Sequence, residues 1–397
     1  MLILSTLSIN HLTICVATPV NFMKIIFFFF SFLFIVPTAF SQKLFAAKEK
    51  NLFGYIDETG RWIIPQKFED AFPFSDGIAR VKMDGYWTYI DLKGDTITGL
   101  HFKGAHDFEG EVARVKVYSN QFKAMLVGLM GRNGKWVTRP AFLKIYKFSD
   151  NGLAMAKTSN GLWGFIDKKG KWAVPPTLSA AKNFSDGMAM VRANGEWGYI
   201  NERGEWAIPP MYDRLFPFNE GVAVVEIKKG LMLIDKDNKH LWKQPHEIVE
   251  GCSDGVIVVR KSKWGALDRE GNWVFEPKFD HLDSFINGTA RARDGGEWGL
   301  INKRGEWIVP AQYGDVREFS GDRARVRDNY HWGYTNEKGL LVIPIKFDDA
   351  EDFINGSAIV KIGMKWGIID SNGNFTAPAR YAELRAQLKQ DEEEADL

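Results

Sequence analysis

The chain has 397 residues, of which 45% are hydrophobic and 25% are charged, and its formal net charge is +1. This is the composition of a soluble protein with enough apolar residues for a large core. The balanced charge gives no general field that would attract nucleic acid or an acidic membrane, so we expect no nucleic-acid partner.

The first stretch has the layout of a secretory signal peptide. Lys24 precedes an apolar run over 25–36 that only Ser31 interrupts, and small residues follow at Ala39 and Ser41. A positive residue, a short apolar run and a small-x-small cleavage site are the three parts of such a peptide. The run is shorter than the roughly 20 residues of a membrane-spanning helix.

We therefore predict a signal peptide over 23–41, with Met23 as the true start and residues 1–22 as an upstream mis-start. An uncleaved N-terminal anchor is the alternative. The mature protein would be exported to the periplasm, the cell surface or the medium, without a stable membrane span. Of the two cysteines, Cys15 lies before the cleavage site, so Cys252 would have no intrachain disulfide partner.

From Phe53 onward the chain is a tandem repeat. One unit begins with Trp197-Gly198-Tyr199-Ile200, and the spacing between successive starts, from Trp163 through Leu231 to Trp366, is 34, 34, 33, 34, 34 and 34 residues. A fixed period in this range indicates a repeat array. The third unit contains an insertion over 118–124, and the sixth, at Leu231, has lost the Trp-Gly pair.

Each unit predicts three strands. The first alternates strictly, as in Gly187-Met188-Ala189-Met190-Val191-Arg192, the second begins at the Trp-Gly pair, and the third contains the second Trp. A proline pair such as Pro175-Pro176 should end the third strand, because proline cannot continue a ladder. A loop of about ten residues then carries one Phe, such as Phe184, which we expect to plug between neighbouring units. The Gly after the first Trp indicates close packing, either of the second Trp or of the next repeat's Trp.

The Trp-Gly pair, the following Tyr-Ile-Asp, the turn Gly, the second Trp, the Pro-Pro and the later Phe-Ser-Asp-Gly resemble the WG repeat, also called the KWG repeat, of bacterial proteins. The resemblance extends from about Phe53 to Tyr381. It implies a repeat architecture and, loosely, a binding or interaction role.

The predicted fold is all-β: about ten antiparallel three-stranded meanders over 42–381, stacked into an open, curved solenoid. The number of units exceeds the four to eight blades usual in propellers, which favours the open array. A closed propeller-like ring is the alternative. Residues 382–397 are predicted to form a short helix and an acidic tail.

A screen for catalytic and metal-binding motifs finds no strong signature. Gly128–Lys135 lacks the spacing and the Ser/Thr of a phosphate-binding loop, and Asp235–Asn238 lacks the Gly and the distal Glu of a calcium loop. His240, His246 and Cys252 match no metal motif, and the same holds for a pair of histidines in the second repeat, His101 and His106. We therefore expect neither a cofactor nor a metal. The periodic aspartates are interpreted as turn formers: Asp57, Asp91, Asp167, Asp235, Asp268 and Asp370.

One column of basic residues stands out. The last position of the first strand is basic in eight of nine repeats, with Glu226 as the exception, and the position two residues earlier is basic only in the early and late repeats. Stacked repeats would align these side chains on one face as a groove for an anionic or carbohydrate polymer. Alternatively, each cation pairs with the turn Asp of its own hairpin. The candidate binding residues are Arg192, Arg260, Arg291, Arg293, Arg325, Arg327 and Lys361.

The sequence thus favours a non-catalytic, exported binding or scaffold protein for a protein or an envelope polysaccharide. An envelope-processing enzyme with a site built from the irregular repeats is the alternative. The oligomeric state stays open.

Overall fold

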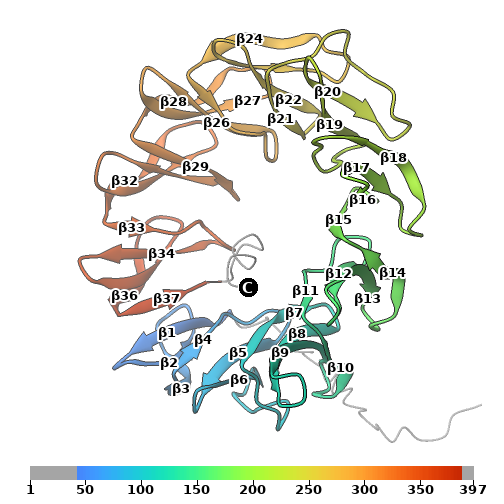
Figure 1. The fold of residues 1–397 in the computed structure, drawn as a ribbon. Helices are drawn as coiled ribbons and strands as arrows, with labels where there is room; N and C mark the ends of the chain where they lie inside the picture. The colour runs from blue at the N-terminus through green and yellow to red at the C-terminus, as the bar shows by residue number, and fades with distance from the viewer. Residues whose placement is uncertain (1–42, 387–397) are drawn as a thin grey trace, which may run out of the picture. The chain divides into compact units, whose positions relative to one another are not determined.

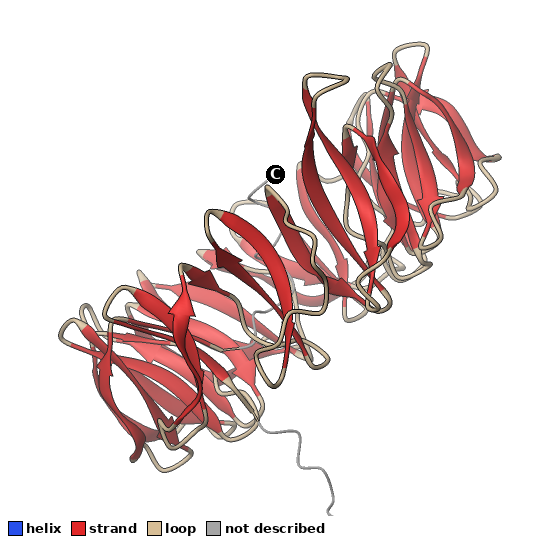
Figure 2. Ribbon diagram, turned by 90° about the horizontal axis from the view of Figure 1, so that it is seen from below, coloured by secondary structure: helices blue, strands red, loops and turns tan. Residues whose placement is uncertain are grey.

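The computed structural model describes residues 43–386. The predicted mis-start, the signal peptide and the acidic tail after residue 386 lie outside the described residues. Within this range every regular element is a strand, as Figure 2 shows, and no helix that could cross a membrane is found there.

The strands form ten small antiparallel sheets, which we number as blades 1 to 10 in chain order. From the innermost strand outward, the first five blades are β37 (Glu383–Arg385), β1 (Phe45–Glu49), β2 (Leu52–Ile56) and β3 (Trp62–Phe68); β4 (Asp70–Ala71), β5 (Ile78–Met83) and β6 (Tyr86–Asp91); β7 (Gly104–Glu109), β8 (Val112–Ser119), β9 (Ala124–Gly131) and β10 (Trp136–Phe142); β11 (Lys144–Ile145), β12 (Leu153–Lys157), β13 (Trp163–Asp167) and β14 (Trp172–Leu178); and β15 (Ala180–Ser185), β16 (Met188–Ala193), β17 (Glu196–Ile200) and β18 (Trp206–Tyr212).

The remaining blades follow the same order. They are β19 (Val222–Ile227) and β20 (Gly230–Asp235); β21 (Ile248–Ser253), β22 (Val256–Arg260), β23 (Trp264–Leu267) and β24 (Trp273–Phe279); β25 (His281–Leu282), β26 (Thr289–Asp294), β27 (Glu297–Asn302) and β28 (Trp307–Tyr313); β29 (Asp315–Ser320), β30 (Arg323–Arg327), β31 (Trp332–Asn336) and β32 (Leu341–Phe347); and β33 (Asp349–Ala350), β34 (Ser357–Ile362), β35 (Lys365–Asp370) and β36 (Phe375–Tyr381).

The blades close into a ring, with strands such as β11, β15 and β21 on the inside and β14, β18 and β24 on the outside (Figure 1). The closing contact is the pairing of β37 with β1, in which Ala47 lies opposite Leu384 and Lys48 opposite Glu383. The first blade is therefore built from both ends of the described chain. The all-β repeat array is confirmed, the closed ring is the alternative that holds, and the open solenoid is wrong. Closure pairs the inner edge of β1, which an open array would leave exposed, with β37.

Two details of the predicted unit are wrong. The stretch read as a loop supplies the innermost strand of the next blade, so a complete blade has four strands. The prolines do not end the outer strand either, because β18 continues through Pro209 and Pro210 to Tyr212. Tyr199 pairs with Ile208 and Trp197 with Tyr212, so the prolines lie in a bulge of an edge strand, where no donor is needed.

The Gly of the Trp-Gly pair is required by the outer strand of its own blade. A Cβ on Gly198 would lie 2.5 Å from the Ile208 carbonyl oxygen and 2.8 Å from the Pro209 carbonyl carbon. The ring of the second Trp comes close only in some blades, as at Gly164, where Trp172 lies 2.8 Å away. The bulged proline segment thus packs directly on the Trp-Gly strand.

The repeated Phe lies between blades, as predicted. The rings of Phe184 and Phe218 lie 4.6 Å from those of Phe165 and Tyr199 in the preceding blade. The Tyr199 hydroxyl also donates to the Phe216 carbonyl oxygen at 2.7 Å. Equivalent pairs recur around the ring, so one aromatic contact and one hydrogen bond join many neighbouring blades.

The predicted C-terminal helix is wrong within the described residues. Glu383–Arg385 forms β37, and Leu384 is buried against the ring closure. The helix-forming composition is overridden because the innermost position of the first blade is vacant and the backbone of these residues can pair there.

Candidate functional site

The turns of each blade lie on two opposite faces because its strands alternate in direction. Counting strands from the inside, the turns between the first and second strands and between the third and fourth share one face, which we call the inner-turn face. The turns between the second and third strands lie on the opposite face, which we call the middle-turn face. The basic columns predicted from the sequence lie on the second strand of each blade.

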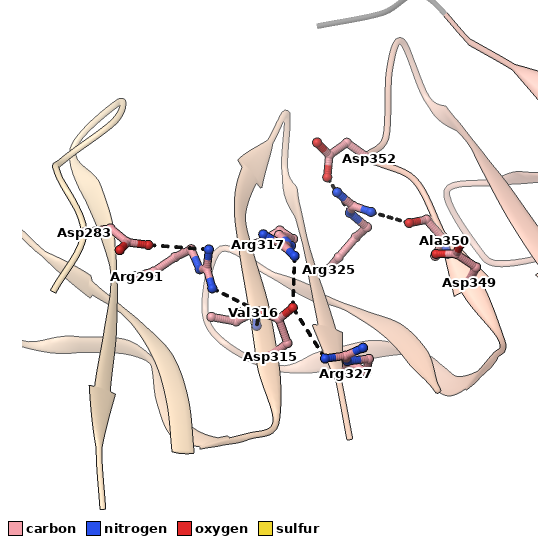
Figure 3. Close-up of polar contacts among 10 residues, drawn as sticks. All are labelled: Asp283, Arg291, Asp315, Val316, Arg317, Arg325, Arg327, Asp349, Ala350 and Asp352. Atoms are coloured by element: carbon pink, nitrogen blue, oxygen red, sulfur yellow. Dashed lines mark hydrogen bonds and ion pairs between the residues drawn. The ribbon is translucent and has the colours of Figure 1, made fainter. Parts of the chain in front are cut away.

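One basic column consists of clamps between blades. We call Arg80, Arg114, Arg291 and Arg325 the clamp arginines. Arg325 donates through Nε to Asp352 Oδ1 at 2.7 Å and also bonds the Ala350 carbonyl, both in the next blade (Figure 3). Arg80 likewise pairs with Asp107 at 2.8 Å and donates to the Ala105 carbonyl oxygen at 2.7 Å.

Arg385 of the closing strand makes the same contact, 2.8 Å from Asp70 Oδ1 and from the Ala71 carbonyl oxygen. Arg114 crosses to blade 4 through a 3.2 Å bond to the Ile145 carbonyl oxygen. Ring closure therefore brings the two basic ends of this column towards each other through Arg385, in an arc from blade 8 through blade 1 to blade 4 that Ile359 of blade 10 interrupts. In blades 4 to 7 the same position holds Met155, Met190, Val224 and Val258.

Asp315 is the most crowded carboxylate of this arc. Its oxygens lie 3.1 Å from Arg291 of blade 8, 3.1 Å from Arg317 and 3.7 Å from Arg327 (Figure 3). Asp315 is buried and also accepts the Val316 N–H at 2.8 Å. Arg291, whose side chain is 16% exposed, is consequently held between the blades, whereas Arg327 is paired with Asp315 but stays 39% exposed.

In four repeats the second basic column stacks on the first Trp of the repeat. The partner Cα positions are Arg327 opposite Trp332 and Lys361 opposite Trp366, and the charged groups lie 5.1 and 5.6 Å from the ring centroids. Arg260 lies 6.0 Å from the Trp264 ring in the same way. In repeat six, where Leu231 replaces the Trp, the opposite residue is Glu226.

Cation–π pairing across the hairpin thus accounts for four of the eight basic residues, Lys157, Arg260, Arg327 and Lys361. Lys116 lies opposite Val127 and is not explained in this way. Among the seven predicted binding residues, Arg192, Arg260 and Arg293 are exposed, and they lie on three different blades. Whether they bind a polymer stays a prediction.

The alternative assignment of these cations to the turn aspartates of their own hairpins is wrong. Asp167 accepts the N–H groups of Lys169 and Lys171 at 2.8 and 2.9 Å, and Asp370 accepts those of Asn372 and Asn374. The carboxylates are used by their own turns, as expected for turn formers.

The histidines and the cysteine singled out in the sequence do not come together in one site. Burial, then the nearby Arg114, lowers the pKa of His106 to about 2. Burial, then a hydrogen bond to Glu220, raises the pKa of the Cys252 thiol to about 11. These two residues lie in blades 3 and 7, and among residues 43–386 no group of three His, Cys, Asp or Glu side chains is arranged to hold a metal.

The middle turns show the clearest departure from the repeat. In blades 9, 10, 1, 2 and 3 these turns expose large apolar side chains, which we call the apolar arc. Its members are Leu52 (39% exposed), Tyr86 (39%), Tyr118 (54%), Phe122 (54%), Met125 (38%), Tyr330 (77%), Ile362 (44%) and Met364 (80%).

The middle turns of blades 4 to 8 expose no large apolar side chain among the described residues. They consist mainly of residues such as Asn194-Gly195-Glu196 and Lys261-Ser262-Lys263. Because β37 joins blade 10 to blade 1, the five apolar turns are consecutive around the ring. Sequence reasoning missed them, although comparing the turn residues of successive repeats would have shown the contrast.

The fold and its turns define a ten-bladed, propeller-like β-repeat ring whose variable surface lies in its turns. A family model described as "WG containing repeat" matches residues 53–87, 87–120, 128–163, 163–197, 197–230, 264–298, 298–330 and 332–366. These segments cover more than half of the chain, so the protein belongs to the WG-repeat family. The degenerate sixth unit falls in the unmatched stretch between 230 and 264. No curated protein sequence matches significantly.

Similar solved structures include a eukaryotic initiation factor, at 11% identity and a TM-score of 0.48, covering 87% of this chain and 97% of that one. The extracellular domain of the putative hybrid two-component system BT3049 from B. thetaiotaomicron matches at 11% identity and a TM-score of 0.25, covering 87% of this chain and 56% of that one. PorZ, a surface component of the type-IX secretion system of Porphyromonas gingivalis, matches at 11% identity and a TM-score of 0.25, covering 84% and 57%. The chain thus spans just over half of the last two, and similarity at this level carries no information on function.

Proposed function

We propose that this protein is an exported, non-catalytic binding protein that docks another protein on the apolar arc of its middle-turn face. The observation that carries the proposal concerns the middle turns alone: among them, those of five consecutive blades expose large apolar side chains and those of blades 4 to 8 expose none among the described residues. Other large apolar side chains, such as Trp206 and Phe375, are exposed on the outer strands. Single exposed apolar residues are normal on protein surfaces, but a contiguous group marks an interaction surface. Export rests on the sequence of residues 23–41.

The most exposed members have the character of interface anchors. Met364 and Tyr330 protrude from the turns of adjacent blades, with 80% and 77% of their surfaces exposed. Tyr86 presents an aromatic ring with the Lys103 ammonium 4.0 Å from its centroid. Tyr and Met are enriched at the centres of protein interfaces, where they fill pockets of the partner.

A protein fits this surface better than a membrane or a polysaccharide. A flat bilayer would approach all ten middle turns, including the polar ones of blades 4 to 8, whereas a compact protein can cover half of the face. A polysaccharide groove would need polar side chains beside the rings, and the most exposed positions here are Met364 and Tyr330. The perturbed groups His106 and Cys252 are explained by burial in separate blades, so no observation favours the enzyme alternative.

Site-specific photo-crosslinking tests the proposal. A photoreactive phenylalanine analogue would replace Met364 in one exported protein and Lys229, in the polar middle turn of blade 6, in the matched control. We expect a discrete crosslinked protein with the first and none with the second. With that protein purified, Tyr330→Ser should weaken binding by about 2 kcal/mol, or about 30-fold in Kd.

Equal crosslinking at both positions, or crosslinking to lipid or polysaccharide alone, would refute docking of a protein on the apolar arc. Unchanged affinity of the Tyr330→Ser protein for a purified partner would do the same.

A further inference from the structure

The inner-turn face carries a cleft of about 510 Å³ between blades 4 and 5. One wall is the segment 147–151, which leads into and forms the inner turn of blade 4, and the other is 183–187, from β15 and its turn. Phe148 and Phe184, which are 8% and 5% exposed, form its apolar part. The cleft lies on the face opposite the apolar arc and is independent of it.

The cleft coincides with a turn that differs from those of other blades. In blade 5 the inner turn has two residues, Asp186 and Gly187, both with positive φ, between the paired Ser185 and Met188. In blade 4 three residues, 150–152, separate Ser149 from Leu153, and only Gly152 has positive φ. The Ser149 N–H donates to the Leu153 carbonyl oxygen at 2.9 Å and the Gly152 N–H to the Ser149 carbonyl oxygen at 2.8 Å, so the longer turn is fully formed.

This turn fixes an unused hydrogen-bond donor at the cleft. Asn151 accepts the Leu153 N–H through Oδ1 at 3.1 Å, which orients its amide. Its Nδ2 is buried and has no partner among the described residues. A buried donor without a partner is costly, so a ligand that accepts from it would be favoured.

On the other wall of the cleft, neutral residues stand at the positions that form an Arg–Asp clamp in other blades. At the contacts between blades 2 and 3 and between blades 9 and 10, an Arg pairs with an Asp of the next blade. Here the two positions hold Met155 and Asn183. The Asn183 side chain accepts the Met155 N–H at 3.0 Å and donates to the Lys147 carbonyl oxygen at 2.9 Å. Asn183 thus satisfies one backbone N–H and one backbone carbonyl of blade 4 where Arg and Asp pair in the other two contacts.

The polar groups of the cleft suit hydroxyls rather than a charge. The exposed Asp150 carboxylate and the Ser149 hydroxyl make no bond with a described residue, so the cleft lining offers an acceptor and a hydroxyl in addition to the Asn151 amide. Asp186 is occupied by Lys236, 3.0 Å away, and by the Gly221 N–H. With Lys147 also in the lining, the cleft is close to neutral.

We propose that this cleft binds one residue of a neutral saccharide. Vicinal hydroxyls of a sugar donate to the Asp150 carboxylate and accept from Asn151 Nδ2, while the aliphatic face of the ring packs on the Phe148 and Phe184 edges. The volume is within the range of small-ligand pockets. A carboxylate and an amide together satisfy hydroxyls, each of which is both donor and acceptor.

The test uses saturation-transfer NMR with the full exported chain and a panel of neutral probes: the methyl glycosides of glucose, galactose, mannose and N-acetylglucosamine. Asn151→Asp keeps the acceptor for the Leu153 N–H, removes the unused donor and adds one negative charge beside Asp150. Asp150→Ala removes the acceptor at a position without positive φ. Asp322→Ala, an exposed aspartate in the inner turn of blade 9, is the matched control.

We expect saturation transfer to at least one glycoside, an affinity loss of about tenfold or more in Asn151→Asp and in Asp150→Ala, and no change in Asp322→Ala. An unchanged melting temperature in all three variants would show that the fold is intact. Absence of transfer to every probe, or equal affinity of wild type and Asn151→Asp, would overturn the saccharide site. Either result leaves the protein-docking proposal standing, because that proposal depends on the opposite face.

Discussion

Two contacts between blades, one with an Arg–Asp clamp and one without, allow the contribution of a clamp to the free energy of unfolding to be predicted. Arg325 and Asp352 join blades 9 and 10, and their side chains are 19% and 8% exposed. At the contact between blades 4 and 5 the same two positions hold Met155 and Asn183. The molecule therefore contains an ionic and a neutral solution to the same contact.

Changing Arg325 to Met should destabilise the protein by about 3 kcal/mol, because it leaves the buried Asp352 carboxylate without its guanidinium and removes a bond to the Ala350 carbonyl. Adding Asp352→Asn should recover about 2 kcal/mol, because the amide is neutral and can bond backbone as Asn183 does.

The assay is urea unfolding of wild type, both single variants and the double variant, with free energies compared at equal m-values. The predicted result is a strongly non-additive cycle, in which the double variant is more stable than Arg325→Met alone. Additive effects of the two changes would refute the view that this pair is a buried clamp. A double variant less stable than either single variant would refute the internal comparison.

Gly198→Ala should cost about 1–3 kcal/mol, because the new Cβ would lie 2.5 Å from the Ile208 carbonyl oxygen, and unchanged urea midpoints would contradict this packing. Between pH 7 and 5 the wild type should lose about 2 kcal/mol that a His106→Gln protein does not lose. Burial lowers the folded-state pKa of His106 to about 2, so only the unfolded chain, with a pKa near 6.5, gains a proton, and parallel pH profiles of stability would count against it. Arg291→Glu should destabilise by about 3 kcal/mol and the exposed Arg293→Glu by less than about 0.5, so similar thermal midpoints would exclude a clamp at Arg291.

The sequence was sufficient for the repeat, the strands and the role of the interblade Phe, because these features recur with the same period and the same alternation. It was insufficient for ring closure. Glu383–Arg385 has helix-forming neighbours, and only the empty place beside β1 makes it a strand. The Pro209-Pro210 bulge was missed because a strand's tolerance of proline depends on whether it is an edge, and edges are defined by tertiary structure.

The clamp arginines show why the sequence could not predict which basic residues form a binding site. Alignment of the repeats correctly placed Arg291 and Arg325 in one column, but the carboxylates that pair with them come from the next blade at offsets that differ, 24 residues for Asp315 and 27 for Asp352. Asp315 and Asp352 occupy different positions of their inner strands. The apolar arc was overlooked for a different reason. Tyr330 and Met364 interrupt no repeat pattern, and their adjacency to Tyr86 depends on closure.

The central claim is that the described chain closes into a ring through β37 and β1, since closure makes the apolar arc continuous. The direct measurement is disulfide formation between Lys48→Cys and Glu383→Cys, whose Cα positions are partners across the closing contact, in a chain with Cys15 and Cys252 changed to Ser. Facing residues of antiparallel strands lie within disulfide range. The exposed hairpin pair Ile362→Cys with Lys365→Cys serves as the positive control. We predict that mild oxidation links residues 48 and 383 within one monomer as completely as the control pair. Efficient oxidation of the control, with residues 48 and 383 remaining free thiols, would contradict the ring.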